Sequence, residues 1–225
     1  MRTLISLVLL TLCSTALFSQ STTLKYNLVK GKTYKVKSST VQDRTMTMQG
    51  MERKTETKNF SFFTLKMLDS KPDFFLAEVK FDTMKTTVSM PPMELTSAEK
   101  GDINSEDPVE VTKCILNRLS NSTMVVKMEY TGHVQDIMNH QVIEKTVLEG
   151  IDSLKGQAAM AKGQLEIMVK KDALIGMIEG VTAYLPNNEV KKGAQWESSI
   201  VSKNGGIGMA ISSTFVLKEL SKNKA

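Results

Sequence analysis

The chain has 225 residues, of which 41% are hydrophobic and 24% charged, and its formal net charge is +5 at pH 7. That length suffices for one large domain or two small ones. The densest basic stretch, residues 24–37, has five lysines but lacks the clustered arginine and interleaved aromatic pattern typical of nucleic-acid-binding proteins. Binding to nucleic acid is therefore not expected, whereas peripheral contact with a membrane stays open.

The N-terminus has the pattern of a secretory signal peptide, predicted to comprise residues 1–19. A positive start, Met1-Arg2, precedes the uncharged apolar run LISLVLLTL at residues 4–12. That run is too short to cross a membrane, which takes about 20 residues. Cys13 follows leucine instead of the small residue that lipid attachment requires, so it is assigned to the removed segment. The mature protein is expected to be soluble, in the periplasm or outside the cell.

The first half of the mature chain is rich in strand-forming residues. Strands are predicted at residues 24–28, 33–48, 54–68 and 74–90, with turns at 29–32 and at Gln49-Gly50. Side chains alternate at period two along a strand, so Tyr34, Val36, Met46 and Met48 share one face of the second strand. This apolar face is the predicted ligand-facing surface.

The second half adds helices. Pro91-Pro92 is predicted to end the strand before it, and a polar loop is predicted at residues 93–107. A helix is predicted at 109–119 with Asp107 as its cap. Its Cys114, the one cysteine left in the mature chain, is expected to be a buried thiol. Strands follow near residues 124–130 and 133–138, two or three helices at about 141–185, and strands at 190–202 and 207–220.

Segregated strands and helices favour an α+β fold. We expect one domain over residues 20–225: a long-stranded, twisted antiparallel sheet with a helical insertion packed on one face. Strongly twisted strands could curl it into an open half-barrel around the helices.

Enzymatic chemistry is not indicated by the sequence. No nucleophile elbow, zinc-protease, phosphate-loop or dinucleotide motif is present, and the chain has two histidines. His140 and Glu144 are four residues apart and could share a helix face, with His133 as a third metal ligand, but such residues are more often a surface pair. We expect a non-catalytic protein without a cofactor.

The 15 methionines allow three interpretations. Met46, Met48 and Met51 in TMTMQGM have a spacing that could deliver three thioethers to a soft metal ion such as Cu(I). Methionine is also an ordinary filler of irregular cores, and this structural interpretation is favoured. A third interpretation is an adaptable apolar surface for lipidic or varied partners.

Three stretches together resemble an uncharacterised family of exported bacterial proteins, a domain of unknown function. They are LKYNLVKGKTYKVK, LSNSTMVVKMEYTGHVQDIMN and YLPNNEVKKGAQWESS, and the matching residues are Leu24, Tyr26, Leu28, Gly31, Tyr34, Gly132, Val134, Pro186, Val190, Gly193 and Trp196. The resemblance covers most of the mature chain and implies no activity or catalytic residue. It implies further strands after residue 220, so the chain is expected to be short at its C-terminus.

The leading functional hypothesis is a binding module for an apolar or lipid-like ligand or for a cell-envelope partner. A structural or assembly component of the envelope is the first alternative, and soft-metal binding through methionines the second. The sequence does not indicate the oligomeric state.

Overall fold

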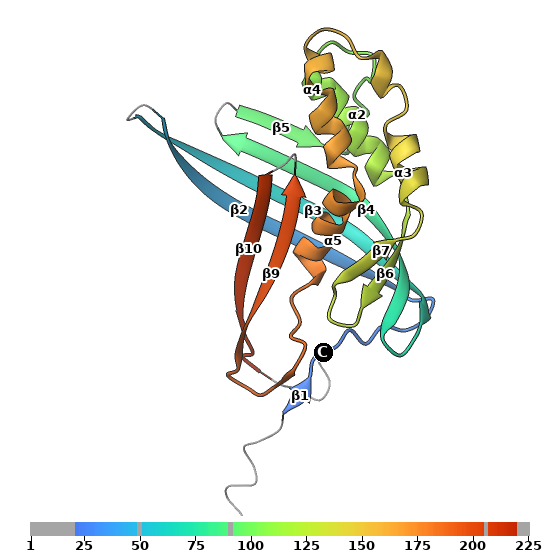
Figure 1. Ribbon diagram of the computed structural model, residues 1–225, viewed down its shortest axis with the longest axis vertical. Coiled ribbons are helices and arrows are strands. Elements are labelled where there is room, and N and C mark those ends of the chain that lie inside the picture. The colour runs from blue at the N-terminus through green and yellow to red at the C-terminus, as the bar shows by residue number, and fades with distance from the viewer. Residues whose placement is uncertain (1–20, 49–50, 90–91, 205–206, 220–225) are drawn as a thin grey trace, which may run out of the picture.

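The computed structural model describes residues 21–48, 51–89, 92–204 and 207–219, and it has the predicted α+β fold (Figure 1). A large antiparallel sheet has the order β2-β3-β4-β6-β7, with β5 paired to β4. Figure 1 shows the helices gathered on one side of this sheet, while the ends of β2 and β3 extend past them. None of the helices in the described part of the chain is long and apolar enough to span a membrane.

The three longest strands follow the sequence prediction closely. They are β2 (Thr33–Met48), β3 (Met51–Ser70) and β4 (Phe74–Ser89). β2 and β3 pair from Thr33↔Lys66 to Met48↔Met51, whereas Gln49 and Gly50 lie outside the described residues. β4 continues the sheet to β6 (Met124–Glu129), which pairs with β7 (Val134–Ile137).

Two predictions for the strands are wrong. Residues 24–28 are not a strand, because β1 covers only Thr22–Thr23 and pairs with β8 (Glu189–Val190). The segment after β4 is not a loop at its start, because β5 (Pro92–Thr96) turns back onto β4. Its five residues are too few for period-two alternation to stand out from the polar stretch that follows.

Four α-helices and one short 3-10 helix of the described residues form the other layer. They are α2 (Pro108–Ser120), α3 (His140–Val147), the 3-10 turn Ile151–Ser153, α4 (Gly156–Met168) and α5 (Lys171–Thr182). Asp107 caps α2 as predicted, since its Oδ1 accepts a hydrogen bond of 2.8 Å from the backbone N–H of Val109. Two or three helices are confirmed in the segment predicted to be helical, with one beginning at Gly156 and the next at Lys171, while Gly163 lies inside α4.

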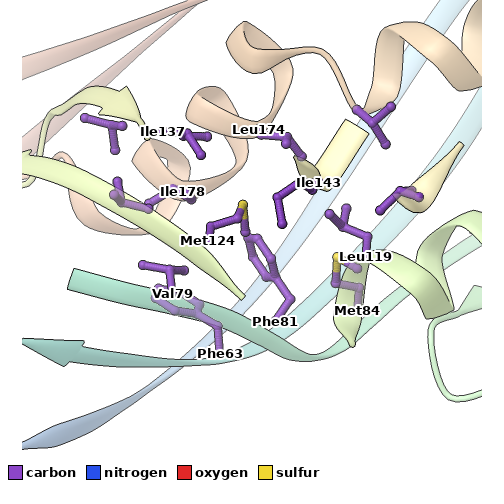
Figure 2. Close-up of a cluster of buried hydrophobic side chains, with 14 of the residues drawn as sticks. Phe63, Val79, Phe81, Met84, Leu119, Met124, Ile137, Ile143, Leu174 and Ile178 are labelled. Atoms are coloured by element: carbon purple, nitrogen blue, oxygen red, sulfur yellow. The ribbon is translucent and has the colours of Figure 1, made fainter. Parts of the chain in front are cut away.

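The core lies between the sheet and the helices (Figure 2). Phe63, Val79, Phe81 and Met124 from the strands meet side chains of the helices, and Figure 2 labels Leu119, Ile143, Leu174 and Ile178 among them. The sulfur-bearing residues Met124, Met84 and Cys114 are all buried here, so these two methionines and the thiol pack the core.

A separate hairpin completes the described structure. β9 (Gln195–Asn204) and β10 (Ile207–Val216) pair only with each other in the described part of the chain, and β9 lies against α5. The sequence prediction for this region is confirmed in type, although its first strand begins five residues later than the predicted Val190 and its second ends at Val216.

Candidate functional site

The predicted ligand-facing residues fall in two regions of β2. Tyr34 and Val36 are half-buried, lie across from Leu65 and Phe63, and pack against the core. The backbones of Met46 and Met48 pair with β3, but their side chains, like that of Met51, lie outside the described residues. Between these regions the same strand face carries polar residues, Ser38, Thr40 and Gln42, of which the last two are exposed.

The histidines have separate partners. His133 Nδ1 lies 3.3 Å from Glu179 Oε1, and that oxygen also accepts a hydrogen bond of 2.8 Å from the N–H of Val134. His140 Nε2 lies 3.1 Å from the Val169 carbonyl oxygen, and its Nδ1 lies 3.8 Å from Glu144 Oε2. Within the described residues, no three His, Cys, Asp or Glu side chains are grouped as metal ligands.

Three aromatic side chains form a partly exposed surface where the β9–β10 hairpin meets the end of α5. Trp196 and Phe215 lie directly across from each other in register and stack with ring centroids 5.9 Å apart. Tyr184, 40% exposed, lies 6.2 Å from Phe215 between ring centroids. We call Tyr184, Trp196 and Phe215 the aromatic surface.

The aromatic surface is connected to the core through a line of rings. The Tyr26 ring contacts Tyr184 edge-on, with ring centroids 6.0 Å apart, and it contacts Phe75 with centroids 6.5 Å apart. Phe75 in turn contacts Tyr130, with centroids 5.5 Å apart. The Tyr26 hydroxyl donates a hydrogen bond of 3.0 Å to the Thr182 carbonyl oxygen. Burial, and then the neighbouring Tyr184, raise the pKa of Tyr26 far above its ordinary value of 10, so this hydroxyl stays a neutral donor.

Hydrogen bonds attach the hairpin to the segment after α5. Trp196 Nε1–H donates to the Tyr184 carbonyl oxygen at 2.8 Å, and the Ser198 hydroxyl donates to the Ala183 carbonyl oxygen at 2.7 Å. Trp196 and Ser198 are two residues apart, so period-two alternation puts both on the face toward α5. Each aromatic side chain of the surface keeps part of its area in solvent.

The three sequence motifs, far apart in the chain, meet at this place. Tyr26 of the first motif bonds to the carbonyl of Thr182, whose hydroxyl donates a hydrogen bond of 2.8 Å to the carbonyl of Gly132 in the second. Trp196 of the third motif bonds to Tyr184, two residues after Thr182. The motif residues therefore build the base of the aromatic surface.

A family model matches residues 72–225, more than half of the chain. The chain belongs to DUF6263, a family of unknown function. No curated protein and no solved structure matches the chain. The motifs around Gly132 and Trp196 lie within the DUF6263 match, and the motif around Tyr26 precedes it. The predicted resemblance to a domain of unknown function is confirmed, and the exported bacterial character stays a prediction.

Tyr184 and Phe215 are site residues that no pattern in the sequence singles out. Tyr184 opens the third motif stretch, and Phe215 lies in a predicted strand, so each looks like an ordinary strand or loop residue. Their contact depends on the pairing of β9 with β10, which brings Phe215 across from Trp196. The single tryptophan of the chain was the one signal that could have pointed here.

A shallow depression of about 370 Å³ lies at the far end of the sheet, away from the aromatic surface. Its lining is polar and charged: Asp43, Thr45, Lys54, Thr55, Glu56 and Ser89. Glu56 Oε1 lies 2.8 Å from Lys58 Nζ, and its backbone N–H donates to Ser89 Oγ at 2.9 Å. These contacts are typical of a solvated strand face, and no aromatic or large aliphatic residue is among the described residues that line the depression.

Proposed function

We propose that this member of DUF6263 is a non-catalytic binding module that takes an apolar, lipid-like ligand on its aromatic surface. The observation that carries the proposal is the group of three half-exposed rings supported from below by the core. Large aromatic side chains bury much area at little cost in side-chain entropy, so they are favoured where a protein contacts an apolar partner. A ligand chain lying across Tyr184, Trp196 and Phe215 would bury the ring area that is now in solvent.

The support under these rings matters for the proposal. Tyr26 is fixed by its hydrogen bond to Thr182 and by ring contacts on both sides. A ligand that meets fixed rings does not have to order them, which lowers the entropic cost of binding. At roughly 25 cal/mol per Å², covering about 50 Å² of one ring contributes ~1 kcal/mol, or about fivefold in affinity.

Trp196 is the one tryptophan of the chain, so its fluorescence reports occupancy of the proposed site directly. We expect a spin-labelled stearic acid, added below its micelle concentration, to quench Trp196 saturably with one ligand per chain. Native mass spectrometry should show the same stoichiometry. Quenching that rises linearly without saturation would refute specific binding on this surface.

Matched variants test the position of the ligand. Tyr184→Ser should weaken the quenching titration about fivefold, and so should Phe215→Ser. Met160→Ser, which removes an 81% exposed apolar side chain from α4, is the control and should leave the titration unchanged. Circular dichroism and the urea midpoint verify that each variant is folded. Equal titrations for the aromatic variants and the control would contradict the proposal.

A structural or assembly role in the cell envelope is the second candidate. It is favoured by the β9–β10 hairpin, because a two-stranded sheet is marginal alone and its outer edges can accept a strand from a partner. Recovery of one partner at a fixed ratio to the chain, with no bound ligand in the mass spectrum, would favour this role over ligand binding. The soft-metal alternative is tested by Cu(I) titration, in which a variant with Met46, Met48 and Met51 changed to Leu should lose binding.

A further inference from the structure

The face of the sheet turned away from the helices brings lysines and phenylalanines together. Lys35 on β2 lies across from Thr64 on β3, which lies across from Lys80 on β4. In the next row Lys37 lies across from Phe62. With strands about 4.8 Å apart and alternate residues about 7 Å apart, these three lysines fall within roughly 12 Å of one another at the backbone.

Phe60 and Phe62 lie on this outer face, whereas their neighbour Phe63 is fully buried on the core side. Both are half-buried, although no helix covers them, and the ammonium group of Lys37 lies 5.5 Å from the centre of the Phe60 ring. Single apolar side chains are ordinary on a protein surface, but two neighbouring rings among lysines give this face an amphipathic character. We call Lys35, Lys37, Lys80, Phe60 and Phe62 the basic face.

The positive charge of the basic face is not neutralised within the described residues. Lys66 and Lys85, nearby, have carboxylate partners, Glu78 at 3.5 Å and Glu94 at 2.8 Å. None of the salt bridges in the described part of the chain involves Lys35, Lys37 or Lys80.

Two acidic side chains of the described residues lie near these lysines, and one of them, Glu78, is paired with Lys66, which leaves Asp82. The register of β3 and β4 shifts between the pairs Phe62↔Thr83 and Phe63↔Phe81. Asp82 is the residue of β4 left between these pairs, and it is exposed. Three lysines against one aspartate leave the face with a positive charge.

We propose that the basic face docks on the surface of a bilayer that contains anionic phospholipid. Lysine side chains are flexible point charges that reach lipid phosphates while their stems stay on apolar surface, and the phenylalanine rings suit the boundary between headgroups and acyl chains. Charge complementarity is the ground for this partner. Nucleic acid is less suited, because the face carries lysine without the arginine forks and the backbone-tracking groove that bind a strand.

Vesicle sedimentation tests the docking. The full chain should sediment with vesicles of phosphatidylglycerol and phosphatidylcholine at low salt and not with vesicles of phosphatidylcholine alone. Binding should fall steeply as salt is raised, because the Debye length shortens from about 10 Å at 0.1 M to about 3 Å at 1 M. Equal binding to neutral vesicles would overturn the proposal.

Charge variants locate the contact. Changing Lys35, Lys37 and Lys80 together to Gln should lower partitioning about a hundredfold, since each lysine near an anionic surface contributes roughly fivefold. The matched control changes three exposed lysines elsewhere, Lys100, Lys155 and Lys191, to Gln and so alters the net charge equally. We expect little loss for the control, and equal loss in both triple variants would refute a specific face.

Two single variants give independent readouts. Asp82→Asn removes the opposing charge and should tighten vesicle binding about fivefold, a gain that a misfolded protein would not show. Phe62→Ser should weaken binding at low salt and leave the salt dependence unchanged, because the lysines remain. An oligonucleotide that displaces the vesicles and binds more tightly would instead assign the face to nucleic acid. The lysine triple variant should keep the Trp196 quenching titration, so that failure of docking is separable from failure of ligand binding.

Discussion

Gly132→Ala is expected to destabilise the fold more than its single added carbon suggests. Gly132 has φ of +97°, a backbone conformation that L residues rarely adopt. A Cβ at this position would lie 2.0 Å from the Thr182 carbonyl oxygen and 2.6 Å from the carbonyl carbon. These atoms belong to the backbone at the end of α5, so they cannot rotate out of the way.

The expected loss of unfolding free energy follows from the backbone strain and from the hydrogen bonds that the added Cβ disturbs. Positive φ costs an alanine roughly 1–2 kcal/mol. Displacing the Thr182 carbonyl disturbs two hydrogen bonds. The Tyr26 hydroxyl donates to this carbonyl oxygen at 3.0 Å, and the Thr182 hydroxyl donates to the Gly132 carbonyl oxygen at 2.8 Å. Each hydrogen bond contributes about 1 kcal/mol net, so the total loss is about 3–4 kcal/mol. That is a large share of the 5–15 kcal/mol typical of a folded domain.

Gly31→Ala is the matched control. Gly31 has φ of +78° but no atom within 4 Å of its would-be Cβ, so it should lose only the roughly 1–2 kcal/mol of the backbone conformation. Urea unfolding followed by circular dichroism gives both free energies from the midpoints and slopes. If Gly132→Ala loses no more stability than Gly31→Ala, the β6–β7 turn does not lie as close to the end of α5 as the structure indicates.

Two further predictions concern charged side chains. Hydrogen bonds and charge from Lys71 and Lys30, each 3.0 Å away, lower the pKa of Asp69 from 3.8 to about 2. Because the folded-state pKa is depressed, the stabilisation from this group is present above about pH 4 and is lost as the pH falls toward 2. In an NMR titration, Lys71→Gln should raise this pKa toward 3.8, and an unchanged pKa would contradict the assignment. Asp107→Ala should cost about 1 kcal/mol in urea unfolding by removing the cap of α2, whereas Asp107→Ser should retain most of the stability.

The parts of the fold that could be predicted from sequence are those whose signal is local and long. β2, β3 and β4 each have at least 16 residues of strand-forming composition, and α2 has a capping aspartate followed by proline. Residues 24–28 have the alternating pattern of a strand, but apart from one bond, from the Tyr26 N–H to the Tyr130 carbonyl at 2.8 Å, they form no ladder. A local sequence pattern does not specify which strand a segment pairs with, so the absence of a ladder at residues 24–28 could not be predicted.

The candidate surfaces were less predictable, because both depend on register between strands. Along residues 24–37 the two aromatic residues, Tyr26 and Tyr34, do not alternate regularly with the five lysines, which is evidence against a binding role. Across the sheet, Lys37 lies beside Phe62 and close to Phe60. Aromatic residues thus interleave with lysines in the direction perpendicular to the chain, which a reading along one strand cannot detect.

Because side chains alternate along β2, one face of this strand packs in the core and the other belongs to the basic face. Tyr34 and Val36 point toward the helices and are half-buried in the core, while Lys35 and Lys37 point outward and are exposed. Because a shift of one residue in register would exchange these faces, burial of Tyr34 and Val36 fixes the lysines on the outside. The core thereby holds the basic face in position, and the aromatic surface, which rests on Tyr26 and α5, is supported independently of it. Ligand binding and membrane docking can therefore be altered one at a time.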